Sequence, residues 1–237
     1  MARSGDWLFR HRSWVPFALL PLVFAEVYRK RLVLGDFPAL DRWWGVGCMA
    51  FAFVGVLVRF HATGHAAPGT SGRNTRYQIA DTLNTSGMYS ITRNPLYLGN
   101  LVITLGLVAA ARSWEIVVAG ALLFLLYYER IVAAEEAYLE GKFGEAYRSW
   151  ASRTPWLLPD VRLWRPAELP FSWARAVRSE YNSLFGITSG LFLIEHARLA
   201  FVKGRLELET FWSIVFVAGA LVYVVCRTLK KRTRLLS

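Results

Sequence analysis

Apolar residues gather in continuous blocks along this chain instead of recurring at the spacing of an amphipathic helix. Basic and aromatic residues flank the blocks, a pattern typical of membrane-spanning helices. Several blocks are shorter than the ~20 residues that cross a bilayer core, but flanking side chains can extend them at the interface. The pattern predicts about five to six spans, at Trp14–Tyr28, Trp43–Val58, Leu96–Ala111, Trp114–Tyr128, Leu184–Ala200 and Phe211–Cys226.

The fifth block leaves two alternatives open. Glu195, His196 and Arg198 lie at the end of the segment 184–200, so this segment either spans the membrane or lies partly in its interface. With either alternative, the predicted fold is all-α, a polytopic transmembrane helical bundle.

Composition supports a membrane protein and indicates its orientation. The 237 residues are 54% hydrophobic, yet they include 28 Lys and Arg against 17 Asp and Glu. In a six-span topology, 20 of the 28 basic residues fall on the side that holds both termini and the long loops 59–95 and 129–180. The positive-inside rule therefore predicts an integral protein of the plasma or inner membrane with both termini cytosolic. Because such loops are ordinarily basic, the net charge of +11 does not indicate a nucleic acid partner.

Two polar motifs flank a predicted helical hairpin. Only Arg112 and Ser113 separate the blocks 96–111 and 114–128, so these blocks should form antiparallel neighbours. Their outer ends then reach the same membrane face, one with the sequence RNPLY (93–97) and the other with YYERIVAAEE (127–136). If the second helix continues, Glu135 lies about 10 Å beyond Tyr128. The topology predicts a cytosol-facing pocket with carboxylates, an arginine and tyrosines.

Each component of this pocket also has a simpler interpretation. Asn94 and Pro95 are a common helix start, with Asn as N-cap and Pro at the first helical position. Glu135 and Glu136 are compatible with a solvated helix face, and Arg93 with a side chain that reaches lipid phosphates. The joint arrangement, more than any single residue, favours a functional site.

Other candidate sites are weaker. His61 and His65 are four residues apart, but no nearby carboxylate or cysteine completes a metal ligand set, so we predict no metal site. Cys48 and Cys226 fall in separate predicted helices and are expected to be packing residues. The sequence also contains no Walker loop, Ser-His-Asp arrangement or Rossmann glycine fingerprint.

The segment 85–99, TSGMYSITRNPLYLG, resembles the signature loop of the isoprenylcysteine carboxyl methyltransferase and phospholipid methyltransferase superfamily. That signature reads approximately Gly-x-Tyr-x-x-x-Arg-His-Pro-x-Tyr-x-Gly. The run 135–147, EEAYLEGKFGEAY, is similar to the family's Glu-Glu-x-x-Leu…Phe-Gly-x-x-Tyr run, and 153–159 resembles the proline-containing segment that follows. The resemblance implies an integral membrane enzyme that uses S-adenosylmethionine without the soluble Rossmann-type fold.

The resemblance also implies a role for individual residues. Carboxylates would bind the cations of a zwitterionic sulfonium ligand, and N–H groups at a helix start would bind its carboxylate. Arg93 and Arg130 are the expected catalytic residues, with Arg130 toward the acceptor. The expected cofactor-binding residues are Leu83, Asn84, Tyr89, Asn94, Pro95, Leu96, Tyr97, Glu135 and Glu136.

The resemblance, which covers roughly 80–160, divides the chain into three parts. Residues 1–79 would form N-terminal transmembrane helices and a cytosolic loop, 80–160 the methyltransferase core, and 161–237 a C-terminal interfacial segment with further transmembrane helices.

One departure from the signature bears on the acceptor. Asn94 replaces the family's histidine and cannot act as a base near neutral pH. An acceptor that is already an anion needs no base, so we expect a membrane lipid or lipidated acceptor with a phosphate or carboxylate. Phospholipid amine N-methylation is one alternative. A non-enzymatic transporter or assembly factor is another, although the sequence contains no internal repeat of the kind found in transporters.

Overall fold

The computed structural model describes residues 19–29, 38–67, 70 and 80–233. Within these ranges the chain is helical and contains no strand, which confirms the predicted all-α class. The elements are α2 (Leu20–Arg29), α3 (Pro38–His65), α4 (Met88–Ile91), α5 (Pro95–Ala109), α6 (Trp114–Phe143), α7 (Glu145–Ala151), a 3-10 turn η2 (Val161–Leu163), α8 (Trp173–Lys203) and α9 (Thr210–Arg232).

Four helices are long and apolar enough to cross a membrane, namely Arg42–His65 of α3, α6, α8 and α9, and α5 is a shorter apolar helix. The ambiguous segment 184–200 lies inside α8, which has 31 residues and qualifies as a span. Part of the first predicted block, residues 14–18, lies outside the described residues, and the rest falls in the shorter helix α2. The helices are those of an integral membrane protein.

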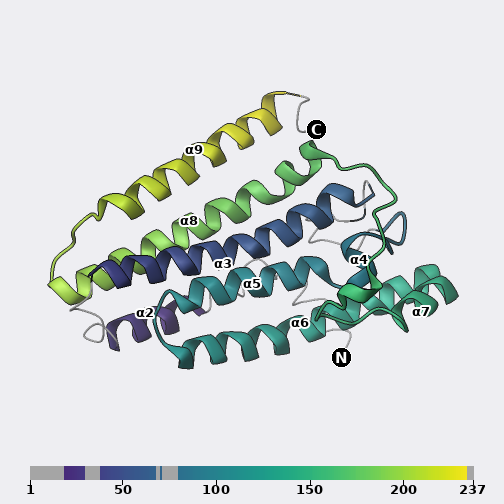
Figure 1. Cartoon of the computed structure of the whole chain (residues 1–237), viewed down its shortest axis with the longest axis horizontal. Helices are drawn as coiled ribbons and strands as arrows, with labels where there is room; N and C mark the ends of the chain where they lie inside the picture. Colours follow the sequence, from purple (N-terminus) through teal and green to yellow (C-terminus); the bar gives the residue numbers. More distant parts are fainter. Residues whose placement is uncertain (1–18, 30–37, 68–69, 71–79, 234–237) are drawn as a thin grey trace.

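The long helices run side by side in the order α9, α8, α3, α5 and α6 (Figure 1), and each contacts the next. Helix α2 lies against α8 and α6. The main apolar core joins these helices around Ala52 of α3 and Leu191 of α8, both fully buried. By contrast, α9 buries little of its surface within the chain, which is consistent with a lipid-facing helix.

Helices α3 and α5 cross at two glycines. A Cβ atom on Gly99 would lie 2.6 Å from the carbonyl oxygen of Gly55 and 2.4 Å from Cγ of Arg59, and a Cβ on Gly55 would lie 2.5 Å from the carbonyl oxygen of Gly99. The absence of side chains therefore allows the two backbones to touch, as small residues commonly do between membrane helices.

The predicted hairpin is present. Helix α5 ends at Ala109, Arg112 takes a left-handed φ of 58°, and the Ser113 side chain accepts a hydrogen bond from the amide of Ile116 to begin α6. Helix α6 continues without a break to Phe143, which confirms the expected continuation through Glu135.

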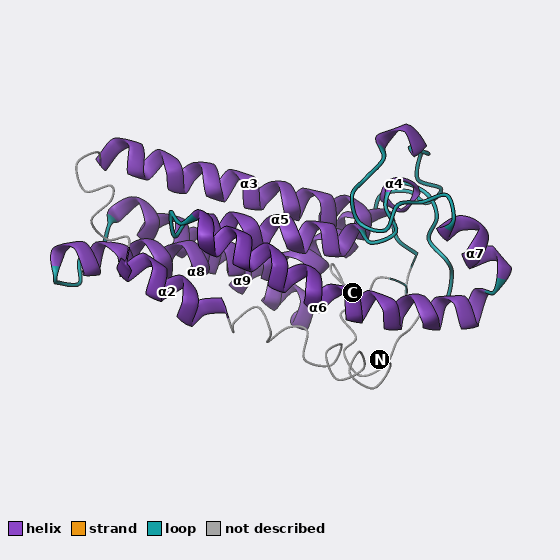
Figure 2. Cartoon of the chain, turned by 90° about the horizontal axis from the view of Figure 1, so that it is seen from below, coloured by secondary structure: helices purple, strands orange, loops and turns teal. Residues whose placement is uncertain are grey.

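The loops that were predicted to share one side of the membrane lie at one end of the bundle. Helix α4, helix α7 and their connections gather there, and the α8–α9 connection lies at the opposite end (Figures 1 and 2). The amide of Ser172 donates to the carbonyl of Gly64, so the end of α3 and the start of α8 are adjacent. One charge was misassigned, because Arg59 lies buried within α3 instead of in the following loop.

Candidate functional site

The signature loop forms a short, sharply turned path into α5. Gly87 takes a φ of 58°, a left-handed conformation that favours glycine, and precedes the single turn of α4. Pro95 occupies the first turn of α5, as predicted. Asn94 stands at the N-cap position, but its side chain makes no capping hydrogen bond; instead, its amide nitrogen donates to the carbonyl of Trp156 at 2.9 Å. The loop is therefore joined through Asn94 to a segment 62 residues later.

The segment 153–168 is hydrogen-bonded to the signature loop. The buried Thr92 hydroxyl donates to the carbonyl of Leu157 at 2.9 Å, and the amide of Arg93 donates to the carbonyl of Pro155 at 2.8 Å. Further along, the amide of Gly87 donates to the carbonyl of Arg165 at 3.0 Å. These bonds run along the length of the loop and fix the backbone that carries Tyr89, Arg93 and Tyr97.

The two polar motifs meet across the hairpin. The Tyr97 hydroxyl on α5 donates to a Glu135 carboxylate oxygen on α6 at 2.7 Å, and Arg93 and Glu136 form an ion pair at 3.2 Å. The Tyr97 ring lies 4.7 Å from that of Tyr128, centroid to centroid. Both glutamates thus contact the signature loop or its helix, as the predicted convergence requires.

Three buried polar atoms in this region have no hydrogen-bond partner among the described residues. They are Nε of Arg93, Oε1 of Glu136 and the hydroxyl of Tyr147. Arg93 Nη1 and Glu136 Oε1 form an ion pair at 3.2 Å, and the Asn94 and Tyr147 side chains approach the same carboxylate. Buried polar atoms are almost always satisfied, so three such atoms close together make this region a candidate place for a bound water, ion or ligand.

Two tyrosines beside the carboxylates are held in their neutral form. Burial, with the Glu136 carboxylate nearby, raises the pKa of Tyr147 to about 12. Burial and then the Glu135 carboxylate raise the pKa of Tyr89, partly opposed by Arg59. The site therefore offers neutral O–H donors and acceptors beside carboxylates and a guanidinium.

These groups fit a small zwitterion that carries an additional cation. Carboxylates at Glu135 and Glu136 suit ammonium and sulfonium groups, and the unsatisfied Nε–H of Arg93 suits a carboxylate. The chemistry of these side chains is therefore compatible with S-adenosylmethionine, which carries an ammonium, a sulfonium and a carboxylate.

Other predicted site residues have different surroundings. Asn84 bonds to the amide of Ala67 and to the Thr70 hydroxyl, beyond the end of α3, and Leu83 next to it is half-buried. Arg130 is exposed on α6, about 160° around the helix from the buried Tyr128. Among the described contacts none joins these three residues to the α5–α6 cluster, so their roles remain predictions.

No metal centre accompanies the cluster in the described part of the chain. The structure there holds no group of three or more His, Cys, Asp and Glu side chains placed to bind a metal ion. Helix α3 extends through His61 and His65, whose rings lie 4.7 Å apart, but the His65 Nδ1 contacts the carbonyl of Leu169.

Sequence reasoning assigned no role to two groups of residues near the site. Tyr147 lies inside the quoted second motif, so its position in that motif was the available signal. Arg59, Asn100 and Glu180 lie outside both motifs and form one buried network beside the site. Asn100, a polar residue within the predicted span 96–111, was the available signal for this network, because polar side chains inside membranes are usually functional or paired.

Comparison with known proteins agrees with this geometry. The model of the family described as phospholipid methyltransferase matches residues 40–146. The cobalt-zinc-cadmium resistance protein CzcN of Cupriavidus metallidurans is 31% identical over 166 residues, which cover 70% of this chain and 72% of that protein. The nickel-cobalt-cadmium resistance protein NccN of Alcaligenes xylosoxydans xylosoxydans is 29% identical over 160 residues, 68% of this chain and 70% of that protein. No solved structure matches this chain significantly.

The matched range contains α3 from residue 40, the signature loop, the hairpin and the Glu135–Glu136 pair, whereas Tyr147 and the segment 153–168 lie beyond its end. The family match thus coincides with most of the part of the chain in which the site geometry was found. This chain belongs to the phospholipid methyltransferase family, within the isoprenylcysteine and phospholipid methyltransferase superfamily.

Proposed function

We propose that this protein transfers a methyl group from S-adenosylmethionine to an anionic group of a lipid or lipidated acceptor at the cytosolic membrane face. The observation that supports this most is the convergence of the Arg93–Glu136 ion pair with the Tyr97–Glu135 hydrogen bond across the α5–α6 hairpin. In this proposal, residues 80–160 are the methyltransferase core, and the flanking helices form the surface by which the acceptor enters.

The chain's residues bind and orient the reactants. When bound, S-adenosylmethionine supplies a methyl group made electrophilic by its sulfonium centre. Glu135, fixed by the Tyr97 hydroxyl, and Glu136 bind the donor's cationic groups, and Arg93 binds its carboxylate. Resemblance to the family assigns Leu83, Asn84, Tyr89 and the turn Asn94–Tyr97 to the donor pocket. It assigns Arg130, exposed on the side of α6 away from Tyr128, to contact with the acceptor. Orientation of this kind accounts for much of the rate of a displacement reaction.

The surroundings of Asn94 favour an anionic acceptor. The Asn94 side chain is neutral near pH 7, and its amide nitrogen is already bonded to the Trp156 carbonyl. The two neighbouring phenols, Tyr89 and Tyr147, have raised pKa values and so are poor bases when neutral and are seldom ionised. An ionised phosphate or carboxylate needs no deprotonation before it attacks the methyl group, whereas an ammonium does.

The length of α5 suits an acceptor that enters from the bilayer. Its 15 residues extend about 22 Å, less than the bilayer core of about 30 Å. With the hairpin connection at one boundary of the bilayer core, the start of α5 and Tyr97 then lie below the opposite boundary, at the depth of the upper lipid chains.

The names of the two relatives suggest a context for this reaction. Both are named for resistance to divalent metals such as cobalt and cadmium. Methylation of a phosphate or carboxylate converts a negatively charged oxygen, which can bind a metal cation, into a neutral ester oxygen. We infer that a membrane containing the methylated lipid exposes fewer anionic groups that can bind metal cations.

Lipid mass spectrometry combined with pH–rate profiles tests the proposal. Cells with the wild-type protein should contain a lipid that carries one added methyl group. Cells with Glu135→Gln should contain only the unmethylated lipid. With an anionic acceptor, kcat should be constant from about pH 7 to pH 9. A kcat that rises across this range would indicate amine N-methylation instead. No methylated product in either strain would favour a transporter or assembly factor.

A further inference from the structure

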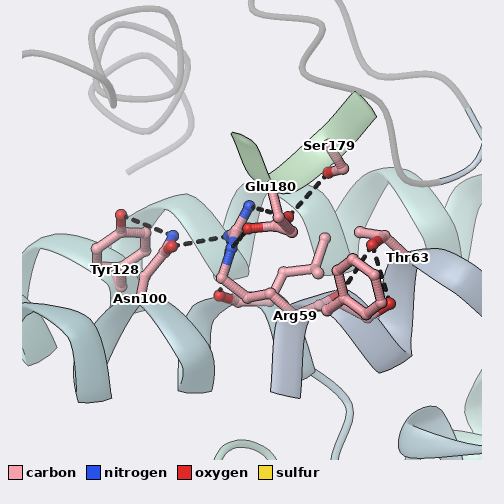
Figure 3. A network of polar contacts seen from close by, with 8 residues as sticks. Arg59, Thr63, Asn100, Tyr128, Ser179 and Glu180 are labelled. Carbon is pink, nitrogen blue, oxygen red and sulfur yellow. Dashed lines mark hydrogen bonds and ion pairs between the residues drawn. The ribbon is translucent and has the colours of Figure 1, made fainter. Parts of the chain in front are cut away.

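A buried polar network joins four helices beside the proposed donor site (Figure 3). The Arg59 guanidinium of α3 donates to both carboxylate oxygens of Glu180 on α8, at 2.8 and 2.9 Å. It also donates to the Asn100 side-chain oxygen on α5 at 2.7 Å, and the Asn100 amide nitrogen donates to the Tyr128 hydroxyl on α6 at 3.3 Å. The network therefore runs from α8 across α3 and α5 to α6.

This network is costly for the fold to maintain. Arg59 is 9% exposed and Glu180 is 1% exposed, although charged groups inside a membrane bundle lose their hydration. A buried ion pair often contributes less stability than apolar residues of the same size would. Gly99 is also needed to make room for the Arg59 side chain, because its Cβ would lie 2.4 Å from Arg59 Cγ. Packing alone gives no reason for such an arrangement.

The network continues into the candidate donor site through aromatic rings. The Tyr128 ring lies 4.7 Å from the Tyr97 ring, and the Tyr97 hydroxyl holds Glu135 at 2.7 Å. Arg59 also donates to the carbonyl of Leu96 in the first turn of α5 at 3.3 Å. Two separate contacts thus connect the Arg59 guanidinium to the helix turn that presents Tyr97.

We propose that Arg59, Asn100 and Glu180 are positioning residues, which hold Tyr128, Tyr97 and thereby Glu135 in the orientation that binds the methyl donor. This inference rests on the proposed function. It makes α8 part of the donor site, although neither sequence motif lies on that helix. Packing of an acceptor lipid against α8 could then shift Glu180. Such a shift would change the affinity for the methyl donor.

A second ion pair on the same helix provides a matched control. Glu195 of α8 is also 1% exposed and accepts two hydrogen bonds from Arg112, at 3.0 and 3.1 Å. Arg112 lies at the hairpin connection, at the end of α5 opposite to Pro95. Replacing Glu195 therefore removes an equally buried charge from the same helix at the end of the bundle away from Glu135.

The experiment compares Glu180→Gln with Glu195→Gln in purified full-length protein. Thermal unfolding in detergent and calorimetric titration with S-adenosylmethionine are measured for each, together with KM and kcat. We expect both variants to lose thermal stability. Only Glu180→Gln should show a rise of about tenfold in the donor Kd, since coupling through packed networks is of this order.

A second variant guards against misfolding of Glu180→Gln. Asn100→Leu replaces the polar amide with an apolar side chain of similar size and so cuts the connection between Arg59 and Tyr128. It should raise the donor Kd and the donor KM, as Glu180→Gln does. Wild-type donor affinity in either network variant would overturn the inference, and so would an equal loss of affinity in Glu195→Gln. Wild-type protein that binds no donor would overturn the proposed function itself, and is therefore a distinct result.

Discussion

Arg93 and Glu136 are the residues whose substitution should affect donor binding most selectively. Both are largely buried, and both keep an unsatisfied polar atom in the site. Glu136→Gln removes the negative charge with little change of shape. Loss of one hydrogen bond to a charged group costs about 1.5–3 kcal/mol, so we expect the donor Kd to rise by at least about tenfold. Equilibrium dialysis with labelled S-adenosylmethionine measures this change.

The control for Glu136→Gln lies four residues further along the same helix. Glu140 forms an ion pair with Arg148 on the exposed surface. Since exposed pairs of this kind contribute little, Glu140→Gln should leave the donor Kd unchanged. Equal affinities of the Glu136→Gln and wild-type proteins would remove Glu136 from the donor site.

Tyr147 should give the protein a specific sensitivity to alkaline pH. Its pKa is raised to about 12, above the value of about 10 for an unfolded chain. The neutral phenol is therefore favoured by folding, and its contribution is complete below about pH 10 and is lost as the pH rises through about 12. Thermal unfolding between about pH 10 and pH 12 should show the wild-type protein losing stability relative to Tyr147→Phe. The same pH dependence of unfolding in both proteins would mean that the Tyr147 hydroxyl is not buried.

For individual residues, the sequence predicted which segments meet in the site better than it predicted the hydrogen-bond partner of each side chain. The convergence of Tyr97 with Glu135 followed from the short hairpin connection and the continued helix. The side-chain direction of Asn94 did not, because its partner is a backbone carbonyl 62 residues away. Local sequence also could not assign Arg59, whose partner Glu180 lies 121 residues further along the chain.

The contact between α3 and α5 is the packing interaction on which the hairpin's position depends. Gly99→Ala would place a methyl group 2.4 Å from Arg59 and 2.6 Å from the Gly55 carbonyl, so the helices must separate. Overpacking of this kind costs about 1–3 kcal/mol. We expect a lower unfolding temperature in detergent. Gly47→Ala on α3 has no atom within 4 Å and should unfold like the wild type; an equal loss of stability in both variants would contradict the close packing.

Helix boundaries were predicted most accurately where neighbouring residues determine them. The tight turn at 112–113 and the start of α5 at Pro95 follow directly from local residues. Helix α8 was ambiguous because Glu195 and Arg198 lower its hydropathy, whereas in the structure these charges pair with each other and with Arg112. Pairing with a residue 83 positions away cannot be read from a single segment.

The whole molecule has one end occupied by the site and another formed by the α8–α9 connection, so orientation can be tested directly. Ser152 near α7 and Arg205 in the α8–α9 connection are both exposed and lie at opposite ends. We expect Ser152→Cys to react with a membrane-impermeant thiol reagent only from the cytosolic side, and Arg205→Cys only from the other. The reverse pattern would contradict the cytosolic site. Cys48 is buried, and Cys226→Ala removes the remaining native thiol from the labelling background.

Exposed aromatic and apolar residues at the site end agree with a position at the membrane surface. Leu158, Val161 and Trp173 are among the most exposed large hydrophobic side chains of the described residues, and Trp164 lies between them in the sequence. Tryptophan is enriched at the membrane–water interface, where one side of the ring contacts lipid. This supports a site that opens where the reactive group of a lipid is held.

The most direct test of the central claim is calorimetric titration of S-adenosylmethionine into purified wild-type protein and Glu135→Gln. Glu135 is the carboxylate that the Tyr97 hydroxyl fixes across the hairpin. We expect one donor molecule to bind each wild-type chain, with an affinity at least about tenfold weaker in the variant because a charge-assisted contact is lost. Absence of binding to the wild type, or the same affinity in both proteins, would contradict the proposal that the two motifs form a methyl-donor site.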